Sequence, residues 1–298
     1  MSKKVGFVAI VGRPNVGKST LMNKVLGQKV SITSRRPQTT RHRILGIHTT
    51  ATAQIIFVDT PGLHKGGKKA INQFMNRQAS QSIGNVDAVV FVVEGTRWTD
   101  EDDMVAAKLQ NLDVPLFIAV NKVDLIDNKE KLLPALASIQ SKVPTAKDII
   151  PVSAAKGSNL DRFEKMIEEC LPESDTFYPE DQITDKTDRF LTAEVIREKL
   201  MRSLGQELPY VCTVEIEQFK EDKQLLEIAA VIWVERDGQK AIIIGKQGQK
   251  LKEIGTAARK ELEVMFGQKV FLQLWVRVKS GWTDDIRALQ SLGYRDNE

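Results

Sequence analysis

Residues 12–19 read Gly-Arg-Pro-Asn-Val-Gly-Lys-Ser and match the pattern G-x-x-x-x-G-K-[ST]. An apolar run, residues 5–11, precedes them, and residues 20–26 continue as a helix-forming segment. In this setting a buried strand ends in a glycine-rich turn whose backbone N–H groups face inward, beside the positive end of a helix dipole. The segment therefore predicts a strand, a polyphosphate-binding loop and a helix, which together begin an α/β domain.

The residue types in this loop suit phosphate chemistry. Gly12 and Gly17 let the backbone approach the phosphates without a Cβ. Lys18 can reach the β and γ oxygens, and the Ser19 hydroxyl can ligate Mg²⁺. The residues that we expect around the phosphates are Gly12, Asn15, Val16, Gly17, Lys18, Ser19, Thr20 and Gly62.

A second apolar run, residues 114–120, ends in Asn-Lys-Val-Asp and predicts which base is bound. The Asp124 carboxylate can accept hydrogen bonds from N1–H and the N2 amino group of guanine, two donors that adenine lacks, so an ATPase is disfavoured. Asn121 is expected to brace the loop and contact the base edge, and the Lys122 stem to cover one ring face. A third strand and tight turn, residues 148–155, place a backbone N–H near guanine O6. The predicted guanine-binding residues are Asn121, Lys122, Asp124, Ser153 and Ala154.

Two further segments are expected to sense the third phosphate. Residues 54–59 form an apolar strand that ends at Asp59, which can hold Mg²⁺ through water, and the Gly62 N–H can contact the γ-phosphate. In the polar loop upstream, Thr40, rather than Thr39, is the expected second Mg²⁺ ligand. The predicted switch residues are Gln38, Thr39, Thr40 and Arg41, and then Asp59, Thr60, Pro61, Gly62 and Leu63.

In this order the motifs resemble those of translation-factor-related bacterial GTPases over residues 1 to about 170. The phosphate loop, together with Gln-Thr-Thr-Arg at 38–41 and Asp-Thr-Pro-Gly-Leu at 59–63, is similar to that of the Era family. The resemblance implies a Mg²⁺-dependent GTPase with a slow intrinsic rate. Lys18, Thr40 and Gly62 are its expected catalytic residues.

Leu63 follows Gly62, where Ras-like proteins carry the glutamine that orients the attacking water. Leucine cannot position water, so hydrolysis has to depend on backbone groups, on Mg²⁺, on a group supplied in trans or on a monovalent cation. Related GTPases with asparagine at the position of Asn15 can use K⁺ to offset charge between the β and γ phosphates. The resemblance therefore suggests a K⁺ site at Asn15.

Length and composition agree with a cytoplasmic two-domain protein. The chain has 298 residues, a formal net charge of +4 and two cysteines, Cys170 and Cys212, which are too few for a disulfide framework or a metal site. No run of 18 apolar residues suggests a membrane span, and the first residues do not resemble a signal peptide. We expect both cysteines to be small packing residues.

The chain changes character after residue 171. Two prolines and several acidic residues mark residues 172–188 as a linker, in which Phe177 and Tyr178 are expected to pin the segment to one domain. The predicted organisation is a GTP-binding domain at 1–171, this linker, and an RNA-binding domain at 189–298 that ends in a short helix.

The last domain is indicated by a Gly-x-x-Gly loop, Gly245 to Gly248, between two helical segments. Such loops clamp nucleotides in KH domains, although the motif alone is weak. The order of predicted elements, α-β-β-α-α-β, resembles the prokaryotic type II KH domain. The full prediction is an α/β P-loop GTPase domain, with a mostly parallel sheet and helices on both faces, followed by an α+β type II KH domain.

Local charge supports RNA binding. Residues 191–298 carry 17 Lys and Arg against 17 Asp and Glu, whereas residues 236–260 carry seven basic residues against two acidic ones. A basic patch of this kind is the expected phosphate-contacting surface. The predicted RNA-binding residues are Arg236, Lys240, Ile244, Gly245, Lys246, Gln247, Gly248, Lys250 and Lys252.

The family resemblance implies a monomeric GTP/GDP switch that binds single-stranded 16S rRNA near its 3′ end and acts in small ribosomal subunit assembly. Two other interpretations stay open. In the first, the protein signals at the inner membrane or in the cell cycle, as a peripheral protein whose basic patch contacts anionic lipid. In the second, it is a nearly non-catalytic RNA-binding module that uses GTP structurally, as Leu63 would permit.

Overall fold

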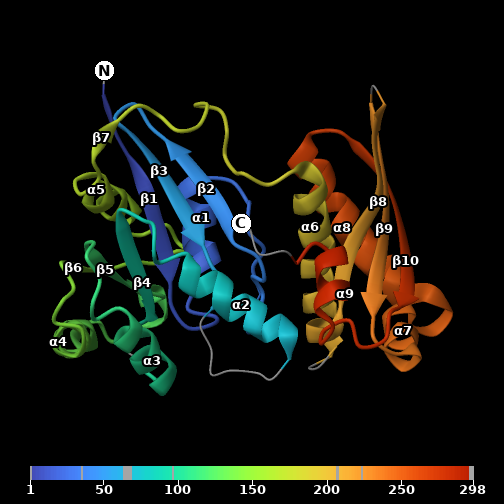
Figure 1. Ribbon diagram of the computed structural model, residues 1–298, viewed down its shortest axis with the longest axis horizontal. Helices are drawn as coiled ribbons and strands as arrows, with labels where there is room; N and C mark the ends of the chain where they lie inside the picture. The colour runs from blue at the N-terminus through green and yellow to red at the C-terminus, as the bar shows by residue number, and fades with distance from the viewer. Residues whose placement is uncertain are drawn as a thin grey trace. The chain divides into compact units, whose positions relative to one another are not determined.

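The computed structural model describes residues 2–34, 36–62, 69–95, 97–205, 208–222 and 224–294. The chain divides into two compact units, whose helices and strands are labelled in Figure 1. The first unit comprises Met1–Gly67 and Met75–Asp185, and the second comprises Lys68–Phe74 and Lys186–Glu298.

The first unit is built on a mostly parallel sheet with the strand order β2-β3-β1-β4-β5-β6, to which β7 adds beside β1. Only β2 and β7 are antiparallel to the strands that they pair with, β3 and β1. The strands are β1 (Lys3–Val11), β2 (Ile44–Thr49), β3 (Ala53–Asp59), β4 (Ala88–Glu94), β5 (Leu116–Asn121), β6 (Asp148–Pro151) and β7 (Glu173–Ser174).

Helices cover both faces of this sheet, as expected for strands that are apolar along their whole length. On one face, Val105 of α3 and Ile139 of α4 share a core with Phe91 of β4. On the other face, Phe163 of α5 stacks on Phe57 of β3, with ring centroids 6.4 Å apart. The helices are α1 (Lys18–Leu26), α2 (Ala70–Gln81), α3 (Asp100–Lys108), α4 (Leu132–Lys142) and α5 (Leu160–Glu168), with short 3-10 turns at Val123–Leu125 and Lys129–Lys131.

Most of the predicted linker is part of the first unit. The buried Gln54 side chain accepts hydrogen bonds from the backbone N–H groups of Phe177 (2.8 Å) and Tyr178 (3.0 Å), and it donates to the Tyr178 carbonyl (2.8 Å). The Phe177 ring stacks on Phe7 of β1 at 5.6 Å. The two aromatic residues therefore hold the segment to this unit, and the chain up to Asp185 is not a free spacer.

The second unit has the α-β-β-α-α-β order that the sequence predicts. Its sheet has the order β10-β9-β8, with β10 parallel and β8 antiparallel to β9. The elements are α6 (Asp188–Ser203), a 3-10 turn at Leu208–Val211, β8 (Thr213–Asp222), β9 (Leu225–Val234), α7 (Asp237–Ile244), a 3-10 turn at Lys246–Gly248, α8 (Gln249–Phe266), β10 (Lys269–Val278) and α9 (Ile286–Ser291).

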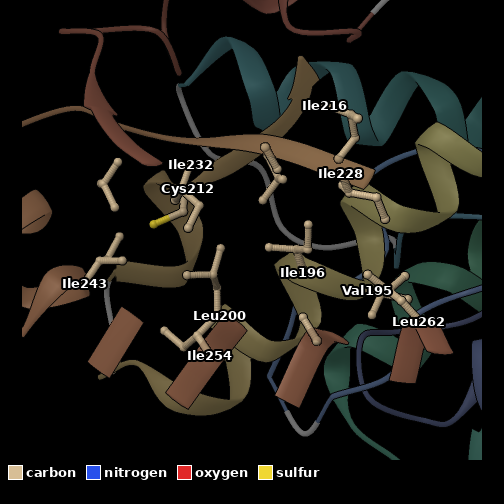
Figure 2. Packing of buried hydrophobic residues seen from close by; sticks show 14 of the residues in the cluster. Val195, Ile196, Leu200, Cys212, Ile216, Ile228, Ile232, Ile243, Ile254 and Leu262 are labelled. Carbon is tan, nitrogen blue, oxygen red and sulfur yellow. The ribbon is translucent and has the colours of Figure 1, made fainter. Parts of the chain in front are cut away.

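Apolar side chains of α6, α7, α8 and the sheet form the core of this unit (Figure 2), among them Leu200, Ile232, Ile243 and Ile254. Cys212 belongs to this core, in agreement with its expected packing role, whereas Cys170 is half-buried; both are free thiols.

The side chains of β10 alternate between the two faces of its sheet. Leu272 and Leu274 pack toward the core of the second unit. Phe271 and Trp275 lie on the opposite face, and Trp275 is 42% exposed. Within the described parts of the chain, we find no helix that combines the length and apolar composition needed to span a bilayer.

Candidate functional site

The phosphate loop starts where β1 ends, and its two glycines adopt conformations that other residues rarely reach. Gly12 has a φ of 149° and Gly17, which precedes the first turn of α1, has a φ of 103°. A Cβ on Gly12 would lie 2.4 Å from the Val92 carbonyl oxygen, and one on Gly17 would lie 2.3 Å from Asn121 Nδ2. Both positions therefore require glycine for backbone conformation and for space.

The Lys18 ammonium lies inside the loop. Its Nζ donates to the carbonyl oxygens of Gly12 and Arg13, at 2.9 Å each, and the side chain is almost fully buried. Burial lowers the pKa of Lys18 to about 8, although the negative charge of Asp59 opposes this shift. A phosphate oxygen beside this ammonium would raise this pKa again, because it stabilises the charged form.

Three oxygen-bearing side chains that the sequence assigns to Mg²⁺ come together next to Lys18. Ser19 Oγ donates to Asp59 Oδ2 at 2.7 Å and lies 2.9 Å from Thr40 Oγ1. Asp59 Oδ1 is buried and accepts no hydrogen bond among the residues described. Burial raises the pKa of Asp59 in spite of its hydrogen bond from Ser19 and the nearby Lys18 charge. An unsatisfied carboxylate oxygen beside two hydroxyls is a donor set that suits Mg²⁺.

Sequence reasoning missed Ser31, which is fully buried and donates to the same Asp59 Oδ2 at 2.8 Å. This serine lies in the loop after α1, where nothing in its neighbours distinguishes it from a solvated loop residue.

The structure separates the two neighbouring threonines of the switch loop. Thr40 is buried beside Ser19, whereas the Thr39 hydroxyl donates to the Arg36 carbonyl at 2.8 Å and lies 2.8 Å from Ser34 Oγ. Thr40 is therefore the residue that the fold brings to the oxygen cluster. Of the other switch residues, Arg41 is buried and Thr60 Oγ1 donates to the Ile10 carbonyl, while Leu63 lies outside the described residues.

The predicted guanine loop follows β5 and is joined to the phosphate loop. Asn121 Nδ2 donates to the Val16 carbonyl at 2.8 Å, which is the bracing contact expected from the sequence. Asn121 Oδ1 accepts the Ala154 N–H at 2.9 Å, so the N–H expected to reach guanine O6 has an internal partner. Ser153 Oγ donates to Asp124 Oδ1 and thereby orients this exposed carboxylate.

A pocket of about 430 Å³ connects these parts. It brings together most of the predicted phosphate residues, two switch residues beside Thr40, and Lys122, and it adds the exposed Leu125. Of the described residues predicted to contact the phosphates or guanine, six are not part of its lining: Gly12, Val16, Asn121, Asp124, Ser153 and Ala154. The lining residues are Pro14, Asn15, Gly17, Lys18, Ser19, Thr20, Ile32, Thr33, Ser34, Gln38, Thr39, Thr40, Gly62, Lys122 and Leu125.

The Gly-x-x-Gly loop of the second unit joins α7 to α8. Gly245 (φ 72°, ψ −178°), Gln247 (φ 52°) and Gly248 (φ 77°) all have positive φ. A Cβ on Gly245 would lie 2.5 Å from Lys250 Cβ, whereas one on Gly248 would meet no atom within 4 Å. Gly245 is thus required by packing, and Gly248 opens the loop toward solvent.

Beside this loop, a groove of about 350 Å³ runs between α8 and β10. Of the predicted RNA-binding residues, Gly248 and Lys252 line it, while Lys246 and Gln247 are exposed on the loop. Sequence reasoning missed Thr256, Leu272 and Leu274, and it counted Arg259 in the basic patch of residues 236–260 without listing it among the RNA-binding residues. Thr256 and Arg259 follow Lys252 at helical spacing on α8, which is a signal that could have identified them. The full lining is Gly248, Leu251, Lys252, Gly255, Thr256, Arg259, Leu272 and Leu274.

A nucleotide-type pocket at the ends of a mostly parallel sheet, followed by a KH-type unit, defines a P-loop GTPase with a C-terminal KH domain. Comparison with family models agrees, because residues 7–122 match the 50S ribosome-binding GTPase family and residues 207–283 match the KH domain.

Relatives that match over nearly the whole chain identify the family within this class. GTPase Era of Ectopseudomonas mendocina is 59% identical over 293 residues, covering 98% of each chain, and GTPase Era of Pseudomonas fluorescens is 58% identical, covering 98% of this chain and 97% of the other. This chain belongs to the Era family, and it is a GTPase.

Two solved Era structures have the same fold, each with a TM-score of 0.94 and 42% identity, covering 98% of this chain and 99% of the other. One is a variant of Aquifex aeolicus Era bound to GDP·AlF4⁻. The other is Era in complex with MgGDPNP and nucleotides 1506–1542 of 16S ribosomal RNA.

Proposed function

We propose that the pocket of the first unit binds GTP with Mg²⁺ held by Ser19 and Thr40 and, through water, by Asp59. The observation that carries this proposal is the meeting of these three oxygen donors beside Lys18, with one Asp59 oxygen buried and unpartnered. A relative crystallised with MgGDPNP supports the same ion. Bound Mg²⁺ would neutralise charge on the β- and γ-phosphates.

For hydrolysis, Lys18, Thr40 and the Gly62 N–H are the groups that we assign to the γ-phosphate and its developing charge. With Leu63 in place of a glutamine, no side chain at that position orients water. We assign a K⁺ ion to the side of Asn15, which lines the pocket. Replacing K⁺ with Na⁺ should lower turnover, and equal rates in the two salts would exclude this role.

Guanine selection is assigned to Asp124, which accepts from N1–H and the N2 amino group, with Asn121, Lys122, Ser153 and Ala154 around it. Replacing Asp124 with alanine removes two charge-assisted hydrogen bonds and should weaken GDP binding by a factor of about 10² to 10⁴. Asp127→Ala, an exposed acid on the same loop, is the matched control. GDP affinity that survives Asp124→Ala would reject this assignment.

In this proposal, the second unit binds single-stranded RNA from the 3′ region of 16S rRNA during small-subunit assembly. Support comes from the Gly-x-x-Gly loop, the adjoining groove with Lys252, and the Era relative solved with nucleotides 1506–1542 of 16S ribosomal RNA. The residues assigned to RNA are Arg236, Lys240, Ile244, Gly245, Lys246, Gln247, Gly248, Lys250 and Lys252.

The RNA assignment is tested with an oligonucleotide copied from the 3′ end of 16S rRNA. Lys246→Ala and Lys252→Ala should weaken binding and reduce its salt dependence, whereas Lys220→Ala, an exposed lysine on β8, should not. Comparing the forms bound to GDP and to a GTP analogue at one salt concentration measures the coupling between nucleotide and RNA. Equal RNA affinities in the two forms would mean that binding of this RNA is not coupled to the bound nucleotide.

We propose that the protein is a monomer and acts in the cytoplasm. Peripheral contact with the inner membrane is a further proposal. The functional boundaries that we assign are a GTP-binding domain at 1–171, a connecting segment at 172–188 and a KH domain at 189–298. Flotation with anionic vesicles, in the presence and absence of RNA, separates a membrane role for the basic residues from an RNA role.

A further inference from the structure

Arg13 lies within the phosphate loop, yet its side chain is not part of the pocket lining described above. The side chain is buried, and its guanidinium donates to two carboxylates: Nε to Asp102 Oδ2 and Nη2 to Glu94 Oε2, each at 2.9 Å. Arg13 therefore does not serve as a phosphate ligand; it ties the phosphate loop to the ends of two neighbouring elements.

Asp102 is a rigid anchor for this arginine. It is fully buried in the first turn of α3, where its Oδ2 also accepts from the backbone N–H and the hydroxyl of Thr99, at 2.9 Å each. These bonds close the capping box at the start of the helix. Because the helix fixes Asp102, Asp102 fixes one side of the Arg13 guanidinium.

Glu94 forms the other side and extends the network to the predicted guanine loop. The same Oε2 atom that accepts from Arg13 lies 3.2 Å from Lys122 Nζ. Glu94 ends β4 and is paired in register with Asn121 at the end of β5, so the fold places it next to the start of that loop. Although burial opposes it, the hydrogen bond from Arg13 together with the Lys122 charge holds the pKa of Glu94 below its usual value, so it is ionised at neutral pH.

Charge balance shows what this cluster contributes. Arg13 and Lys122 supply two positive charges, and Glu94 and Asp102 supply two negative charges, so the cluster adds no net charge to the phosphate site. The Glu94 and Lys122 side chains are 23% and 29% exposed, which makes their contact stronger than an ordinary surface ion pair. The contacts among Arg13, Glu94, Asp102 and Lys122 therefore affect the positions of these side chains and not the net charge near the phosphates.

We propose that Glu94 is a positioning residue for nucleotide binding: its Oε2 contacts both the Lys122 ammonium and the Arg13 guanidinium, and this shared contact sets the Lys122 stem over the guanine ring relative to the phosphate loop. The inference rests on the guanine site proposed above. Lys122 has a left-handed backbone (φ 63°) and lines the pocket, so an anchor at its Nζ fixes the path of the whole side chain between these two points.

A double-mutant cycle in the full-length chain tests this role, with GDP and a non-hydrolysable GTP analogue as ligands. Glu94→Gln keeps the shape of the side chain and removes its charge. Lys122→Met keeps the stem and removes the ammonium. Glu169→Gln, an exposed acid immediately after α5, is the control for loss of one negative charge and should bind both nucleotides as the unaltered chain does.

Glu94→Gln should raise the dissociation constants of GDP and of the analogue by the same factor, about tenfold, which is typical for loss of a partly buried contact between charged groups. In the Lys122→Met chain the same substitution should cost about twofold or less, because the end that Glu94 holds is already absent. An equal cost in both backgrounds would show that Glu94 acts only through Arg13, and would overturn the proposal.

Thermal unfolding of each variant shows whether a loss of affinity reflects a loss of fold. If Glu94→Gln does not fold, Glu94→Asp enters the cycle in its place, since it keeps the charge but is one methylene too short to contact both cations. A separate measurement tests the proposed guanine site: the site is refuted if the unaltered chain binds GDP and ADP equally well. If the unaltered chain prefers GDP to ADP but the effects of Glu94→Gln and Lys122→Met on nucleotide affinity are additive, only the proposed role of Glu94 is refuted.

Discussion

The two glycines of the Gly-x-x-Gly loop should respond differently to alanine. At Gly245 the backbone lies in a region open almost only to glycine, which costs another residue about 1–3 kcal/mol, and the new Cβ would lie 2.5 Å from Lys250 Cβ. Relieving such an overlap adds about 1–3 kcal/mol. We therefore expect Gly245→Ala to lower the free energy of unfolding of the second unit by about 2–6 kcal/mol.

Gly248 has an ordinary left-handed conformation (φ 77°, ψ 3°), for which alanine costs about 1–2 kcal/mol, and its Cβ would meet no atom within 4 Å. Because this open side faces away from the protein, an added methyl group should obstruct RNA more than it disturbs the fold. Gly248→Ala should therefore bind the 16S oligonucleotide about tenfold more weakly, a loss of about 1.4 kcal/mol, while the second unit stays folded.

Urea unfolding of the nucleotide-bound full chain, followed by tryptophan fluorescence, measures the first effect. Three of the four tryptophans, at positions 233, 275 and 282, are in the second unit, and Trp98 is in the first. RNA titration of the folded variants measures the second effect. Equal destabilisation by the two substitutions, or a larger effect of Gly248→Ala on folding, would refute the reasoning from conformation and space.

Three further results are expected. Thr40→Ala should reduce Mg²⁺-dependent turnover at least about tenfold, while Thr39→Ala, which removes the hydroxyl that contacts Ser34 and Arg36 within the loop, should reduce it less; equal losses would show that the oxygen cluster is not the metal site. With the pKa of Lys18 at about 8 in the nucleotide-free chain, GDP binding at pH 8 should take up about half a proton, and affinity should fall as the pH rises from 7 to 9; calorimetry in buffers of different ionisation enthalpy that detects no uptake would contradict this. Gln54→Ala should destabilise the first unit by about 2–3 kcal/mol, because it removes three hydrogen bonds that hold the backbone of Phe177 and Tyr178, each worth about 1 kcal/mol; a thermal midpoint shift below about 3 °C would argue against that role.

Much of the first unit could be predicted because its signals are local. The phosphate loop is recognisable from eight consecutive residues, and it and the motifs at Asp59, Asn121 and Ser153 each lie at or just after the end of an apolar strand. Parallel strands bring such ends to one edge of a sheet, so the order of motifs along the chain also predicts the site. The choice of Thr40 over Thr39 rested on position alone, and the structure places Thr40 beside Ser19.

What the sequence did not reveal depends on contacts between residues far apart in the chain. Arg13 meets Glu94 and Asp102 across more than 80 residues, and neither carboxylate belongs to a motif. Gln54 looks like the polar start of a strand, but its side chain holds backbone more than 120 residues away, so the predicted linker is partly structural. Ser31 is hidden for the same reason, because a buried serine and a solvated one have the same sequence neighbours.

The internal bond from the Ala154 N–H to Asn121 Oδ1 has a consequence for how selectivity arises. A guanine oxygen that reaches this donor replaces an acceptor that is already there, so the exchange yields little net free energy. In the proposed guanine site, preference for the correct base would then come mainly from the penalty on wrong bases, which would leave the Asp124 carboxylate without its donors. Such a site can be strict without binding tightly, which leaves the nucleotide free to exchange.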